Sequence, residues 1–213
     1  VGAVFGTFLA QAVVTARPGS PLRRIVSTAS GVLAYFGGVP LAFAFIAALG
    51  QTGIATVWLR AVGLDLYAAG FRIDSLTGLG LTYVYFQVPL MVILVTPALE
   101  GLVPQWREAA ENLGASAWQY WRHVALPVLA PALAGATLVL FGNAFAAYAT
   151  ALALTSGSIP LVPTAIASAL SGNVLAGRQN VGLALGLTMV VVIAVVMVAY
   201  LLLQRRAARW TAA

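Results

Sequence analysis

The chain has 213 residues, of which 62% are hydrophobic and 8% are charged, and its mean hydropathy is +0.98. A soluble domain needs a polar shell in which roughly a quarter of all residues are charged, so this composition excludes a soluble globular protein and indicates a membrane protein. The net charge of +6 comes from arginines that cluster beside apolar runs, since the sequence contains no lysine. That clustering is typical of membrane topology and not of nucleic-acid binding.

Five apolar runs predict membrane-spanning helices, because about 20 apolar residues cross the roughly 30 Å hydrocarbon core of a bilayer. The first run, residues 1–16, is short for a span, but the basic turn that follows it marks a helix end. The four longer runs cover residues 25–49, 76–99, 128–155 and 181–204. We therefore expect an all-α polytopic helix bundle that forms one transmembrane domain over residues 1–213. The chain starts with Val1 and not with methionine, and an odd number of spans that starts outside is expected if an earlier, sixth span belongs to the full-length protein.

Arginines in the loops predict the orientation of the chain, because basic residues are retained in the cytoplasm during insertion. One set of alternate loops holds Arg17, Arg23, Arg24, Arg107, Arg122, Arg205, Arg206 and Arg209, and the other set holds Arg60, Arg72 and Arg178. The larger set is expected in the cytoplasm. The N-terminus of the chain should then lie outside, and the C-terminus should be cytoplasmic.

Small residues inside the predicted spans favour close approach of helix backbones. Glycine pairs occur at Gly2 and Gly6, at Gly37 and Gly38, and at Gly182 and Gly186. Prolines within the spans leave backbone carbonyls that need other partners, so we expect the spans to pack as a bundle. The alternative is that such pairs are frequent in spanning helices and mark no particular contact.

Polar side chains deep in the third and fourth runs are candidates for a solute path, because burying them costs free energy unless they face a cavity or another polar group. They are Tyr83, Tyr85, Gln87, Asn143 and Tyr148, with Gln87 and Asn143 as the best pair. The alternative is hydrogen bonding that only fastens the helices together. No charged residue lies in the middle of a predicted span, which argues against an ion-coupled carrier.

The loop at about residues 100–127 is the most polar stretch of its length in the chain. Apolar residues recur at helical spacing in it twice, at Trp106, Ala110 and Leu113 and again at Trp118, Trp121 and Val124. Gly114 lies between the two stripes, and glycine adopts the left-handed conformation that ends one helix and turns the chain into another. The loop is therefore predicted to form a helix, a turn and a second helix at the membrane surface.

The same loop resembles the Glu-Ala-Ala loop of binding-protein-dependent importer permeases. The resemblance rests on Glu108, Ala109, Ala110, Gly114, Val124, Leu126 and Pro127, with valine where the family more often has isoleucine. It implies a coupling helix seated in a cleft of a cytoplasmic ATPase, with Glu108 paired to a basic residue, the two alanines allowing close approach, and Gly114 setting the turn. The alternative is an amphipathic helix that only lies on lipid.

The resemblance also implies partners and a location for the chain. An importer of this type is a multi-pass protein of the bacterial plasma membrane that works with two ATP-binding-cassette ATPase subunits, a second permease subunit and an extracytoplasmic solute-binding protein. We expect the two permease subunits to differ in sequence, although a homodimer is the alternative. Residues 156–180, which contain Pro160 and Pro163, are expected to form a broken segment on the outer face that touches the binding protein.

The solute is less well specified than the machinery. Residues 141–180 look similar to permeases of the spermidine/putrescine, ferric-iron and thiamine group, and the polyamine branch is the preferred assignment. A channel-like or structural membrane subunit is the competing hypothesis from another class.

The sequence predicts no enzyme activity, cofactor or metal site in this chain. His123 is the only histidine and has no second metal ligand in its segment, and a chain without lysine has no phosphate-binding loop of the Gly-x4-Gly-Lys type. ATP must therefore be hydrolysed in a partner subunit.

Overall fold

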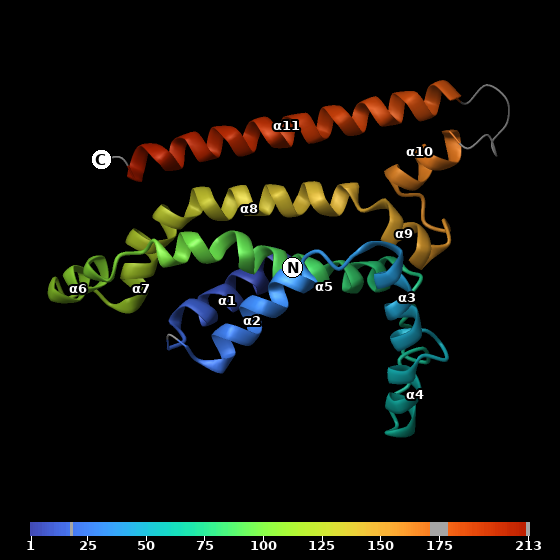
Figure 1. The fold of residues 1–213 in the computed structure, drawn as a ribbon, viewed down its shortest axis with the longest axis horizontal. Helices are drawn as coiled ribbons and strands as arrows, with labels where there is room; N and C mark the ends of the chain where they lie inside the picture. Colours follow the sequence, from blue (N-terminus) through green and yellow to red (C-terminus); the bar gives the residue numbers. More distant parts are fainter. Residues whose placement is uncertain (18, 171–178, 212–213) are drawn as a thin grey trace. The chain divides into compact units, whose positions relative to one another are not determined.

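The computed structural model describes residues 1–17, 19–170 and 179–211, and throughout these ranges the regular structure is helical (Figure 1). The predicted all-α fold is confirmed. In chain order the elements are α1 (Gly2–Thr15), α2 (Pro21–Leu33), α3 (Gly38–Leu49), α4 (Ile54–Ala61), α5 (Leu76–Glu100), α6 (Pro104–Asn112), α7 (Ala117–Tyr120), the π-helical turn η1 (Trp121–Ala125), α8 (Leu126–Ala146), α9 (Tyr148–Thr155), α10 (Val162–Leu170) and α11 (Gln179–Thr211).

Four helical segments among the described residues are long and apolar enough to cross a membrane. They are Gly38–Ala61, Leu76–Glu100, Ala117–Ala146 and Asn180–Leu202. The first apolar run forms α1, which has only 14 residues and is shorter than these four. Five apolar helical stretches are therefore present, as expected, but only four of them have the length of a span.

Two of the expected spans are wrong in extent. The run 25–49 is divided between α2 and α3, because Gly38 adopts a left-handed φ of 76° and Pro40 lacks an amide hydrogen. The span begins only at Gly38 and includes α4. The run 128–155 is interrupted at Ala147, whose φ and ψ of −75° and 72° are not helical. Apolar composition alone conceals both breaks.

The chain divides into two compact units, which we call the first and second units. The first comprises Val1–Val32, Gln87–Gly142 and Ala194–Ala213, and the second comprises Leu33–Phe86 and Asn143–Ile193. Three long helices, α5, α8 and α11, contribute residues to both units. Each unit has its own cluster of buried apolar residues.

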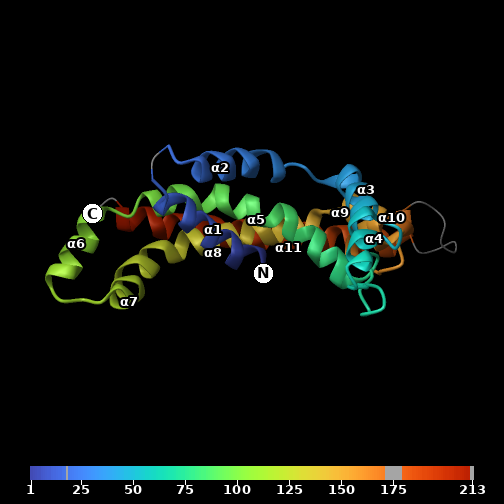
Figure 2. The ribbon, with the colours of Figure 1, turned by 90° about the horizontal axis from the view of Figure 1, so that it is seen from below.

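The first unit is built on a close contact between α1 and α5, which run in the same direction (Figure 2). A Cβ added to Gly2 would lie 2.8 Å from Cβ of Gln87, and one added to Gly6 would lie 2.4 Å from Cβ of Met91. Ala10, one turn further along α1, belongs to the same buried core as Val95. The small residues at i, i+4 and i+8 thus form the surface on which α5 packs, which confirms the expected role of Gly2 and Gly6.

The other glycine pairs have different roles. Gly186, on α11, has open space where a Cβ would lie, so it makes no close helix contact among the described residues. Gly38 provides the positive φ at the break between α2 and α3 and is not part of a packing surface between helices. On α8, Gly135 lies against the ring of Tyr200 from α11, with 3.1 Å between an added Cβ and the ring carbon Cε2.

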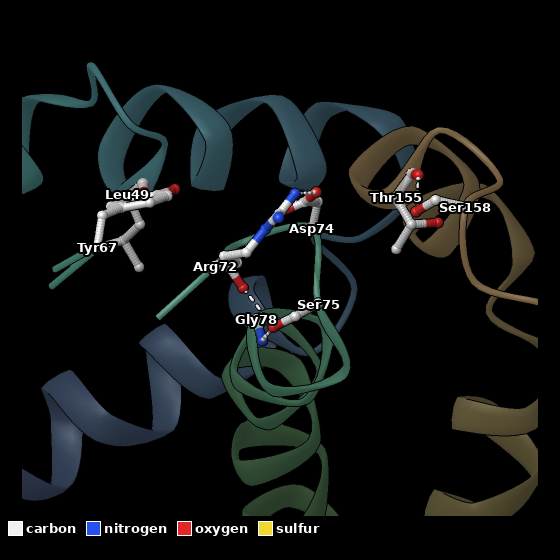
Figure 3. A network of polar contacts seen from close by, with 8 residues as sticks. All are labelled: Leu49, Tyr67, Arg72, Asp74, Ser75, Gly78, Thr155 and Ser158. Carbon is white, nitrogen blue, oxygen red and sulfur yellow. Dashed lines mark hydrogen bonds and ion pairs between the residues drawn. The ribbon is translucent and has the colours of Figure 1, made fainter. Parts of the chain in front are cut away.

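The second unit packs α3 against α9 around Ala42, Ile73, Leu79, Ala151 and Leu154. The loop between α4 and α5 is fixed by polar contacts (Figure 3). The Tyr67 hydroxyl donates to the carbonyl of Leu49 at 3.0 Å, and Arg72 pairs with Asp74 at 2.8 Å. Hydrogen bonding to Arg72 lowers the pKa of the Asp74 carboxyl. This loop therefore carries its charges in locally neutralised pairs.

The segment expected to be broken on the outer face is partly helical. Pro160 precedes the short helix α10, which starts at Val162 and packs on α9. Residues 171–178, including Arg178, lie outside the described residues.

Replacing Gly6 by alanine is expected to lower the free energy of unfolding by about 1–3 kcal/mol, because the new methyl group overlaps Met91. The control is Gly31→Ala in α2, where an added Cβ meets no atom within 4 Å and alanine favours the helix. Unfolding in mixed detergent micelles, followed by tryptophan fluorescence, measures both variants. Equal stability of the two would contradict the close contact between α1 and α5.

Candidate functional site

The loop at residues 100–127 folds as the helix, turn and helix that its sequence predicts. Helix α6 starts with Pro104, where the missing amide hydrogen is no loss, and ends at Asn112. Gly114 has a φ of 77°, and the amide of Ala115 donates to the carbonyl of Ala110 at 2.9 Å. This 6→1 bond after a left-handed glycine is a Schellman motif, which explains why the loop needs glycine at this position.

The second helix starts at a capping box that the sequence analysis missed. The amide of Gln119 donates to Ser116 Oγ at 3.3 Å, and the amide of Ser116 donates to Gln119 Oε1 at 2.7 Å. The spacing Ser-x-x-Gln before an apolar stretch is a readable signal for a helix start. It places the N-cap of α7 at Ser116 and the first helical residue at Ala117, three residues after Gly114.

A π-helical turn then leads into α8. The amide of Leu126 donates to the carbonyl of Trp121, five residues earlier, and Pro127 follows in the first turn of α8. The extra residue per turn shifts the phase of the side chains. Tyr120 and Ala125 are buried as a result, whereas Trp118 is 70% exposed and Trp121 is half-buried. The second stripe expected from regular α-helical spacing therefore does not face one side.

The surface of α6 is unusually open for a segment with so many large side chains. No residue of α6 is buried, Trp106 is 41% exposed, and Leu113, just after the helix, is 87% exposed. Arg107 pairs with Glu111 at 2.8 Å, and this hydrogen bond raises the pKa of the Arg107 guanidinium. Glu108 is exposed and has no side-chain partner among the described residues. The segment thus exposes apolar groups and a carboxylate that has no side-chain partner among the described residues.

A second candidate feature lies where α8 and α9 separate. The Tyr83 hydroxyl donates to the carbonyl of Ala147 at 2.6 Å, which gives the carbonyl of this non-helical residue a hydrogen-bond partner. Thr150 Oγ1 accepts from the amide of Gly38 at 2.9 Å and donates to its carbonyl at 3.2 Å. Side chains therefore satisfy backbone groups at both helix breaks, which lie at the N-terminal ends of α3 and α9.

A cavity of about 470 Å³ lies at these breaks. It is lined by glycine and alanine backbone, by the aromatic side chains Tyr35, Phe86 and Tyr148, and by the polar residues Asn143 and Thr150. None of the side chains lining this cavity is charged. Irregular backbone inside a membrane protein is tolerated where it lines a cavity, and such breaks in spanning helices are where transporters bind polar solutes.

The structure separates the five residues predicted for a solute path. Asn143 and Tyr148 line the cavity, and Tyr83 supports the break beside it. Tyr85 packs edge-on against Phe45, with 5.4 Å between ring centroids. Gln87 belongs to the first unit, where its Nε2 donates to the carbonyl of Leu140 at 2.9 Å and its Oε1 is buried without a partner.

Sequence reasoning did not identify Tyr35, Gly37, Gly38 and Phe86 as lining residues. The only signal available was the consecutive glycines with Pro40 close behind, which mark a helix break but not what it faces.

Comparison with known proteins gives a family model and several partial relatives. The model described as "Binding-protein-dependent transport system inner membrane component" matches residues 2–209. The inner membrane ABC transporter permease protein YdcU of Escherichia coli is 34% identical over 110 residues, which are 47% of this chain and 35% of that protein. The E. coli sulfate transport system permease protein CysT is 41% identical over 64 residues, 30% of this chain and 23% of that protein.

A homolog of the spermidine/putrescine permease protein PotC from Mycoplasma genitalium is 32% identical over 87 residues, 41% of this chain and 30% of that protein. The matched part thus spans about a third or less of each of these relatives. Among solved structures, a bacterial alginate ABC transporter in complex with an alginate-bound periplasmic protein has a TM-score of 0.66 and 19% identity. The similarity covers 99% of this chain and 73% of that chain. It shows that the fold is shared.

Replacing Tyr83 by phenylalanine is expected to destabilise the protein by about 1–3 kcal/mol, because the carbonyl of Ala147 would lose its partner in apolar surroundings. The matched control is Tyr85→Phe, since the Tyr85 hydroxyl has no hydrogen bond among the described residues. Chemical unfolding in detergent measures both. Loss of stability in the control alone would contradict the role given to Tyr83.

Proposed function

The chain belongs to the family of binding-protein-dependent transport system inner membrane components, and we propose that it forms the solute path of an ATP-binding-cassette importer and is driven through residues 100–127. It is a transport subunit in this proposal, and ATP is hydrolysed in a partner. The observation that carries the proposal is the exposed surface of α6, on which Glu108 has no side-chain partner among the described residues, next to a turn fixed by hydrogen bonds.

The coupling role rests on the chemistry of α6. Glu108 is a carboxylate without a side-chain partner among the described residues, so a basic residue of an ATPase subunit can bind it with charge-assisted hydrogen bonds. Ala109 and Ala110 have short side chains that allow a partner to approach closely. The exposed side chains of Trp106 and Leu113 supply apolar area for docking. Gly114, Leu126 and Pro127 fix the turn and the start of α8, through which a push on α6 reaches the spanning helix.

The solute path rests on the cavity at the two helix breaks. Asn143 and Thr150 offer hydrogen bonds, and Tyr35, Phe86 and Tyr148 offer aromatic faces. Tyr83 holds the cavity wall in place, Tyr85 packs against Phe45 in the same unit, and Gln87 links α5 to α8 in the first unit. Alternating access then follows from movement of packed helices as rigid bodies.

The solute is a small polar molecule, and a polyamine is the first candidate because one relative is a homolog of a spermidine/putrescine permease. The carboxylates of the second unit, Asp65 and Asp74, are both paired with arginines. A cationic solute would therefore be held by aromatic faces and carbonyl groups in this subunit. Thiamine or ferric iron carried by the same machinery is the alternative, and the likeness to a sulfate permease adds an anion to be tested.

The partners follow from the same assignment. Two ATPase subunits dock on the coupling segments of two permease subunits, of which the second differs in sequence from this chain. The family description and the alginate transporter complex support an extracytoplasmic binding protein that delivers the solute. A bilayer surrounds the assembly, with the C-terminus on the cytoplasmic side.

Reversing the charge of Glu108 with Glu108→Arg is expected to lower ATP hydrolysis stimulated by the binding protein at least about tenfold, because two basic groups would meet at the docking surface. Glu111→Gln is the control, since Glu111 already pairs with Arg107. Purified complexes in proteoliposomes allow subunit content and hydrolysis to be measured together. Normal assembly and normal stimulation in Glu108→Arg would show that the segment does not couple.

Uptake assays decide the solute. Proteoliposomes holding the assembled transporter and its binding protein are expected to accumulate radiolabelled spermidine when ATP is inside, and not labelled thiamine, sulfate or ferric iron. Accumulation of one of the other three solutes would replace the polyamine assignment. Uptake without ATP would instead favour a channel-like subunit.

A further inference from the structure

One ion pair joins parts of the chain that are far apart in sequence. Of the four ion pairs among the described residues, three link positions within five residues of each other, in the loop between α4 and α5 and on α6. The fourth joins Arg23 in the first turn of α2 to Glu100, the last residue of α5, across 77 positions. Its location is therefore not a by-product of local geometry.

Both ends of this ion pair are held by structure. The start of α2 is fixed by Pro21 and by Ser20, whose hydroxyl accepts from the amide of Arg23 at 3.3 Å. Glu100 ends α5, and only residues 101–103 separate it from Pro104, the first residue of α6. A displacement of α6 is therefore transmitted through only three residues to the end of the helix that carries Glu100.

Packing between α2 and α5 is incomplete around the ion pair. A cavity of about 350 Å³ lies there, lined by Arg23, Ser27 and Ser30 from α2 and by Thr96 and Glu100 from α5. The hydroxyls of Ser27 and Thr96 donate to carbonyls of their own helices, so neither bridges the cavity. Because dispersion contacts are missing across such a space, the ion pair adds a specific link between the two helices, besides the apolar contact of Val26 with the core.

The geometry points to Arg23 as a positioning residue of the coupling mechanism: its ion pair with Glu100 ties α2 to the end of α5, so that α2 moves with the coupling segment. This inference rests on the proposed function of α6. The far end of α2 is Leu33, and the chain continues through Gly37 and Gly38 into the lining of the solute cavity. Through this ion pair and the chain that follows α2, motion of α6 has a second route to the residues that line that cavity, besides α5 itself.

The neighbouring Arg24 provides a matched control. It is exposed, it has the same charge, and it has no side-chain partner among the described residues. Any effect of reversing Arg23 that comes only from changing the charge of α2 should therefore appear equally in Arg24→Glu.

The test uses spin labels, which is convenient because the chain contains no cysteine. Thr28→Cys on the exposed side of α2 and Gln105→Cys on α6 carry one label each in the assembled transporter, and their separation is measured by pulsed electron resonance with and without ATP and vanadate. In the parent protein the distance distribution should stay narrow in both states. Arg23→Glu should broaden it, shifting the ratio of tied to released α2 by roughly twofold to thirtyfold.

A double variant with exchanged charges distinguishes a positioning role of Arg23 from a purely structural one. The double variant Arg23→Glu with Glu100→Arg re-forms the pair with its charges exchanged and should restore the narrow distribution, whereas Arg24→Glu should not alter it. An unchanged distribution in Arg23→Glu, or a double variant as broad as the single one, overturns the tie. Neither result bears on Glu108, whose docking role is judged separately by subunit content and stimulated hydrolysis.

Discussion

Backbone groups inside apolar surroundings must find hydrogen-bond partners, and this requirement determines how the second unit is built. Two helices are interrupted in it, at Gly38 and at Ala147, and each interruption would leave carbonyl or amide groups without partners. Thr150 forms hydrogen bonds with the amide and carbonyl of Gly38, and the Tyr83 hydroxyl donates to the carbonyl of Ala147. These side chains lie on other helices and supply the hydrogen bonds that the interrupted backbone lacks. The non-helical backbone can therefore border a cavity instead of forming a continuous helix.

The coupling segment follows the opposite rule. Its backbone is organised by a Schellman motif, a capping box and a π-helical turn, but no side chain of α6 is buried. A rigid backbone with unpaired side chains loses little conformational entropy on binding. The same segment is joined covalently to two spanning helices, so force applied to its surface is not lost in loop motion. These properties suit a docking site that transmits movement.

Two kinds of interaction hold the helices of the first unit together, close packing between α1 and α5 and an ion pair between α2 and α5. Gly2 and Gly6 let α1 lie directly on α5, which gives a stiff pair of helices. Helix α2 is attached less tightly, through Val26 at the edge of the core and through the ion pair beside a cavity. A loosely packed helix with one specific tie can change position more readily than one embedded in a core, since packed cores resist continuous deformation.

The sequence by itself determined that this protein lies in a lipid bilayer and that it is helical. It also determined that residues 104–127 form a helix, a turn and a second helix. Apolar run length, arginine clustering and the fixed spacing from Glu108 to Pro127 are local properties, and local physics governs them. The tertiary structure alone decided that α8 ends before Ala147, that Asn143 and Tyr148 share a cavity while Gln87 binds a helix carbonyl, and that Arg23 meets Glu100. Those outcomes depend on which distant groups become neighbours, because a hydrogen bond or ion pair between helices leaves no periodic trace in the chain.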